Sequence, residues 1–225
     1  MQSAVPAPSE IGTPRFIRRK SHNPVRFYLL RFSLLFAAVF CLTLILCNFF
    51  LLSPEDAVSS AISSYLKNPF AACVYWHDYL TCVFDVCTPD MVQLALLLLL
   101  GMTFFCTPAC ALVVFYRAFS LGLCTSFLSS YLLLSEAGAN DIAMAWIFVG
   151  AYIAVSFVLC AFSAMTCAVS LDIRAVFSGA RGFGRAVVRR SLRLIGGQIV
   201  RFLTAGGAVI LLRAIQTALF SAIAG

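Results

Sequence analysis

Residues 94–134 read LALLLLLGMTFFCTPACALVVFYRAFSLGLCTSFLSSYLLL, and this run of forty-one residues contains a single charged side chain, Arg117. A hydrocarbon core of about 30 Å is crossed by about 20 apolar residues of helix. The run therefore predicts two membrane spans joined by a very tight turn. We expect Arg117 to mark that turn, where the chain meets water or headgroups. Pro108 lacks a backbone donor and predicts a kink in the first span.

Small residues follow Arg117 at intervals of four, at Ala118, Gly122 and Ser126. This spacing places them on one face of a helix, where a second helix can approach closely inside a membrane. Together with Gly101 and Pro108, they are our predicted helix-packing and kink positions. The alternative is that this face lines a functional cavity.

Composition sets the class of the protein. The chain has 225 residues, of which 62% are hydrophobic and 11% charged. A soluble domain carries about 25% charged residues, so lipid must be the solvent here. The sequence predicts an all-α polytopic integral membrane protein. Its net charge of +7 does not indicate nucleic-acid binding, because the positions of the charges follow the predicted membrane topology.

The chain divides into a basic cytoplasmic leader, residues 1–26, and a single membrane domain, residues 27–225. An outside segment at 53–89 is expected to form amphipathic interfacial helices. An arginine-rich cytoplasmic loop is expected at 172–198. The five predicted transmembrane helices cover residues 32–52, 92–115, 118–134, 142–171 and 199–223.

Charge asymmetry orients these spans. The predicted inside segments hold the bases of the leader, Arg117 and six arginines between 174 and 193, whereas the outside segments hold Lys67 as their single base. The positive-inside rule then predicts an N-in, C-out topology. The arginine-rich loop has two interpretations: attraction to anionic lipid, at about 1 kcal/mol per residue, or a docking surface for a soluble partner.

Ten cysteines are present, and seven of them lie in the predicted spans, where cysteine behaves as a small hydrophobic residue. Cys73, Cys82 and Cys87 lie in the predicted outside segment. They are either free thiols or include a disulfide such as Cys82–Cys87. His77 stands alone among them, so the spacing predicts no metal site.

No catalytic site is predicted. His77 and Asp78 are adjacent, and adjacent residues of a helix point about 100° apart. The sequence contains no serine elbow, HExxH motif, phosphate loop or paired intramembrane carboxylates, so we predict neither an enzyme nor a cofactor. The surrounding aromatic residues suit a headgroup belt. They form a candidate partner-binding surface of Tyr75, Trp76, His77, Asp78 and Tyr79.

Arg213 is the second predicted intramembrane charge, beside Arg117. It lies about twelve residues from the end of the chain, so roughly 18 Å of helix follows it. An arginine at that depth is costly and marks a functional site by default. The alternative is structural: it snorkels, or it bonds carbonyls that Pro108 exposes.

The region around residues 100–128 resembles the stage II sporulation protein M family of bacterial membrane proteins. The family pattern is a Leu-Gly, a Leu/Thr-Pro kink, a Lys/Arg-Gly, a Gly and a Gly-Phe-Leu. The matching positions are Leu100-Gly101, Thr107-Pro108, Arg117-Ala118, Gly122 and Ser126-Phe127-Leu128. Ala118 and Ser126 replace two family glycines, and residues 142–150 lack the proline often found after the third span.

The resemblance implies a non-enzymatic scaffold in the bacterial cytoplasmic membrane. Such a scaffold recruits extracytoplasmic cell-wall hydrolases during engulfment in sporulation, and we expect the segment 53–89 to contact them. Other membrane proteins and further copies of the chain are possible partners, besides membrane lipid. The competing hypothesis is a transporter or permease subunit with a substrate site near the Pro108 kink and Arg213.

Overall fold

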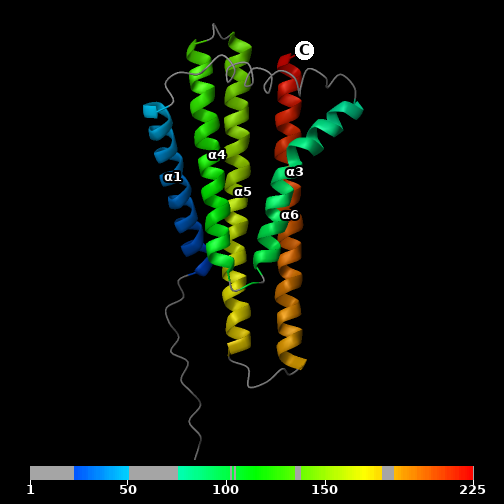
Figure 1. Cartoon of the computed structure of the whole chain (residues 1–225). Helices are drawn as coiled ribbons and strands as arrows, with labels where there is room; N and C mark the ends of the chain where they lie inside the picture. Colours follow the sequence, from blue (N-terminus) through cyan, green and yellow to red (C-terminus); the bar gives the residue numbers. More distant parts are fainter. Residues whose placement is uncertain are drawn as a thin grey trace, which may run out of the picture.

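The computed structural model describes residues 23–50, 76–101, 103, 105–134, 138–178 and 185–224. These residues form a bundle of five helices (Figure 1). The helices are α1 (Pro24–Phe50), α3 (Trp76–Gly101), α4 (Cys106–Leu134), α5 (Ala139–Ser178) and α6 (Arg185–Ala224). All five are long and apolar enough to cross a membrane, so the predicted all-helical class with five spans is confirmed.

The predicted turn at Arg117 is wrong. The predicted spans 92–115 and 118–134 are replaced by α3, which ends at Gly101, and α4, which begins at Cys106. The reason is that α3 starts much earlier than expected and is long and apolar enough to span a membrane by Gly101, so the reversal falls between Gly101 and Cys106. Arg117 consequently lies inside α4. Pro108 lies in the first turn of α4, where proline costs a helix nothing, and not at a mid-span kink.

The predicted outside segment 53–89 is also shorter than expected, because residues 76–89 belong to α3. The expected interfacial helix over residues 53–75 lies outside the described residues. Similarly, most of the predicted loop 172–198 is helical: α5 continues to Ser178, and α6 starts at Arg185.

Helix α5 is the centre of the bundle, because it packs against each of the other four described helices. Helices α5 and α6 have 40 residues each, which corresponds to about 60 Å of helix, or twice a hydrocarbon core. Their connected ends extend beyond the α3–α4 turn (Figure 1). This extension brings the charged residues at the end of α5 and the start of α6 past the level of that turn.

The small-residue face of α4 packs against α1. Ala118, Gly122 and Ser126 are all buried. A methyl group on Gly122 would lie 2.7 Å from the Cβ of Thr43 in α1, so only glycine permits this approach. The cavity-lining alternative has no support from this packing. Gly101 is equally confined, because any side chain there would collide with Thr166 of α5.

Apolar residues divide between a core and an outer face. The largest buried cluster draws on all five described helices and includes Phe32, Leu94, Val114, Phe162 and Val209. Other large apolar residues remain exposed, among them Leu99, Leu112 and Trp146. In water these would be unfavourable, but lipid chains are their natural contact.

Candidate functional site

Three charged side chains meet in the middle of the bundle. Asp90 of α3 is 0% exposed, and Arg117 of α4 and Arg213 of α6 are each 4% exposed. Charged groups in such surroundings are rare and costly unless they are paired. We call this group, together with Tyr152 and Gln216, the ionic node.

The helix registers explain why these residues meet. Asp90 lies eleven residues before Gly101, and Arg117 lies eleven residues after Cys106. In an antiparallel helix pair, residues equally distant from the turn lie at the same level, here about 17 Å from it. Arg213 lies eleven residues before the end of α6, so it too is about 17 Å from a helix end.

Each carboxylate oxygen of Asp90 forms an ion pair with one arginine. Nε and Nη2 of Arg213 both lie 2.8 Å from Oδ2 of Asp90. Nη2 of Arg117 pairs with Oδ1. Asp90 therefore links α3 to α4 by an ion pair and to α6 by an ion pair with a charge-assisted hydrogen bond, which is roughly twice as strong as a neutral one.

Polar and aromatic neighbours complete the node. Nη1 of Arg213 donates to Oε1 of Gln216 at 2.7 Å. The guanidinium carbons of Arg117 and Arg213 lie 4.8 Å and 5.9 Å from the ring centroid of Tyr152 in α5. The negative face of an aromatic ring attracts such cations. With Tyr152, four of the five described helices contribute to the node.

Helix α3 is shaped around this node. Figure 1 shows α3 bent along its length, and Pro89, directly before Asp90, is the proline inside it. Proline removes one helical hydrogen bond and clashes with the preceding turn, so it bends a helix at that level. Tyr79 lies near the start of α3. Its hydroxyl donates to the carbonyl of Ala214 at 2.7 Å and holds α3 against α6.

The structure brings some of the predicted site residues together and separates others. Arg117 and Arg213 are intramembrane charges that meet at Asp90, which was missed because it precedes the predicted span 92–115. Pro108 lies nine residues from Arg117 and does not join a site with Arg213. Trp76, His77 and Asp78 begin α3, and Tyr79 packs within the bundle, so at least Tyr79 is not part of a free outside surface. Tyr75 lies outside the described residues.

Of the two alternatives for Cys82 and Cys87, the structure has the free thiols and not the disulfide; both cysteines lie on α3. Five residues along a helix correspond to about 140° of rotation, so the two side chains diverge. Cys73 lies outside the described residues. Elsewhere, three buried cysteines converge: Cys106 and Cys110 of α4 and Cys167 of α5. Soft metal ions prefer such ligands.

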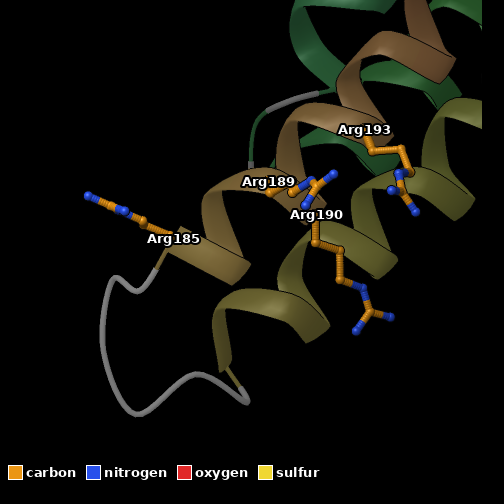
Figure 2. Close-up of a pocket in the computed structure, with 4 residues that line it drawn as sticks. All are labelled: Arg185, Arg189, Arg190 and Arg193. Carbon is orange, nitrogen blue, oxygen red and sulfur yellow. The ribbon is translucent and has the colours of Figure 1, made fainter.

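A second charged region lies at the start of α6. Arg185, Arg189, Arg190 and Arg193 line a hollow of about 630 Å³ (Figure 2). All four side chains are exposed, and Arg185 extends away from the other three. Exposed guanidiniums are suited to phosphate groups, which they bind through bidentate hydrogen bonds.

Comparison of the chain with protein-family models, with curated proteins and with solved structures finds no match. The functional argument therefore depends on the residues of the bundle itself.

Proposed function

We propose that this multi-pass membrane protein is a non-enzymatic scaffold of a bacterial cytoplasmic membrane, which recruits cell-wall remodelling partners outside the cell. The sporulation role in engulfment comes from the resemblance of residues 100–128 to the stage II sporulation protein M family. The corrected helix registers leave that pattern on the end of α3 and along α4.

The observation that carries the proposal is the complete burial of Asp90 between two arginines. A substrate path needs charges that face an open cavity, whereas a scaffold needs charges that satisfy one another. In the ionic node, one arginine lies at each oxygen of the Asp90 carboxylate. Buried polar groups of this kind also favour one helix register over others, which suits a platform of fixed shape.

The distribution of charge supports an N-in, C-out orientation. Arg174, Arg185, Arg189, Arg190 and Arg193 all lie near the connected ends of α5 and α6. Moving Arg117 and Asp90 from loops into the membrane removes one base from the predicted inside and one acid from the predicted outside. The lysine and arginine bias that the positive-inside rule counts remains.

A transporter or permease subunit is the second candidate, and one observation favours it. Nε of Arg117 is buried and has no hydrogen-bond partner among the described residues. A buried donor without a partner is costly, and an anionic substrate would satisfy it. In that case the site lies at the ionic node and not at Pro108.

A pull-down in mild detergent, followed by mass spectrometry, tests the scaffold. The chain is compared with a variant whose residues 53–75 are replaced by a Gly/Ser linker of equal length, which leaves α3 intact. Capture of cell-wall hydrolases by the unmodified chain alone supports the scaffold. Capture of a cytoplasmic ATPase by both forms overturns it in favour of a transporter subunit. Arg185→Gln, an exposed position outside the ionic node, serves as the control and should retain the partners.

Cysteine labelling in intact cells tests the orientation separately. Gly138 and Ser178 are exposed positions at opposite ends of α5. An impermeant thiol reagent should add label to Gly138→Cys in intact cells, and to Ser178→Cys only after permeabilisation. The native protein supplies the background labelling of its own cysteines. The reverse pattern would overturn the N-in topology.

A further inference from the structure

Three thiols form a compact cluster that the ionic node does not use. Sγ of Cys106 lies 3.9 Å from Sγ of Cys110 and 3.8 Å from Sγ of Cys167. All three sulfurs lie within 4.8 Å of one another, and all three residues are buried. We name these residues the cysteine cluster. Cysteines of membrane helices are usually solitary small hydrophobic residues, so the convergence of three sulfurs from two helices needs a separate explanation.

The spacing of the sulfurs matches a single metal ion. Metal–thiolate bonds of about 2.3 Å place three sulfurs around one ion about 4 Å apart in a trigonal plane. The separations of the Cys106 sulfur from those of Cys110 and Cys167, 3.9 Å and 3.8 Å, agree with that arrangement. Cys106 and Cys110 are one helical turn apart on α4, and Cys167 of α5 closes the triangle.

The surroundings favour thiolates at this end of the bundle. Cys106 is the first residue of α4, and the positive end of a helix dipole lowers the cost of a negative sulfur. Arg174 reaches the adjacent turn, where its Nη2 lies 3.5 Å from the carbonyl of Thr103. Both features offset the negative charge that three thiolates around a monovalent ion would create.

The number and type of ligands select the ion. Thiolates bind soft ions such as Cu(I) and also Zn(II). Structural zinc sites are almost always four-coordinate, and the cluster supplies three sulfurs. We propose that Cys106, Cys110 and Cys167 bind one Cu(I) ion, and that the ion ties the start of α4 to α5. Each thiol that binds releases its proton to water, and copper enters and remains as Cu(I), so the step needs no oxidant or reductant.

Anaerobic titration of the purified full-length protein tests the site, with Cu(I) supplied against a chromophoric Cu(I) chelator. The purification tag must contain neither Cys nor His. One Cu(I) per chain should be withdrawn from the chelator, with a thiolate-to-copper charge-transfer band in the ultraviolet. Cys106→Ala and Cys167→Ala should each abolish both signals. Cys160→Ala and Cys47→Ala, which remove buried cysteines of α5 and α1, are the matched controls and should retain them.

Four outcomes would overturn the proposal. They are copper retention unchanged in Cys106→Ala, no copper withdrawn by the native chain, retention of Zn(II) in place of Cu(I), and a Cys106–Cys167 disulfide located in the native chain by peptide mass mapping. If the alanine variants fail to fold, X-ray absorption of the copper-loaded native chain decides. Three sulfur atoms bound to copper at about 2.3 Å would support the site, and any other set of bound atoms would contradict it. The result is independent of the scaffold role.

Discussion

Arginines occupy two opposite environments in this molecule. In the ionic node, Arg117 and Arg213 are almost completely buried and share Asp90. At the start of α6, Arg185, Arg189, Arg190 and Arg193 are exposed and line a hollow. The buried pair is shielded from solvent, and its charge is balanced by one carboxylate. The exposed group remains hydrated and can attract phosphate groups.

The comparison teaches that position, and not the number of charges, determines what an arginine contributes. Removing one partner of a buried pair costs about 3–5 kcal/mol, because the remaining charge stays buried and unpaired. An exposed arginine near an anionic membrane surface contributes about 1 kcal/mol. Salt weakens the second effect far more than the first.

Asp90→Ala should give the largest effect. It leaves two buried guanidiniums without their carboxylate, so the free energy of unfolding should fall by about 3–5 kcal/mol. Denaturant unfolding in mild detergent measures the change. Asp172→Ala, which removes an exposed carboxylate near the end of α5, is the control and should change stability little. Equal stability of the two variants would show that the node is not paired as described.

Replacing the whole node sharpens the comparison. Asp90→Leu combined with Arg117→Met and Arg213→Met removes every charge at once, and buried ion pairs replaced by apolar residues of similar size are often neutral or stabilising. The triple variant should therefore recover most of the stability that Asp90→Ala loses, in the same unfolding measurement. A triple variant as unstable as Asp90→Ala would mean that packing around the node, and not charge, is responsible.

The two buried arginines should differ from each other. Arg213 makes two contacts with Oδ2 of Asp90 and a third hydrogen bond with Gln216, whereas Arg117 pairs with Oδ1. Hydrogen bonds to charged groups contribute about 1.5–3 kcal/mol, so Arg213→Leu should cost about that much and more than Arg117→Leu. Either variant leaves Asp90 with one arginine, so both should be milder than Asp90→Ala. The reverse order in thermal unfolding would contradict the described geometry.

The sequence predicted the membrane class and the number of spans, because about 20 apolar residues per crossing is a strong physical constraint. It misplaced the α3–α4 turn. Arg117 was taken as a marker of water, since an arginine in lipid is costly, but a partner 27 residues earlier in the chain removes that cost. Helix α3 contains three acids, Asp78, Asp85 and Asp90, and α4 contains one base, Arg117; an acid in one span and a base in the next are the signal that such a pair exists.

Equal distances from Gly101 and Cys106 would have aligned Asp90 with Arg117, once the turn was placed at residues 102–105. The cysteine cluster was harder to predict from the sequence. Cys106 and Cys110 share a helix face by their spacing, but Cys167 joins them only through the packing of α5 against α4. No local pattern in the sequence encodes that contact.

The exposed arginines should give the smallest effect and the only one sensitive to salt. Arg189→Gln combined with Arg190→Gln removes two charges from the hollow, so retention of phosphatidylglycerol should fall about fivefold per charge at low salt. Native mass spectrometry from mixed phosphatidylglycerol and phosphatidylcholine bicelles counts the retained lipids.

Arg185→Gln is the control, because its side chain extends away from the other three (Figure 2). At about 1 M salt, where charges are screened within about 3 Å, the difference between the double variant and the native chain should disappear. An unchanged lipid count at low salt would contradict lipid binding and favour a soluble partner for these arginines. Both the exposed and the buried arginines would then act through contacts with protein.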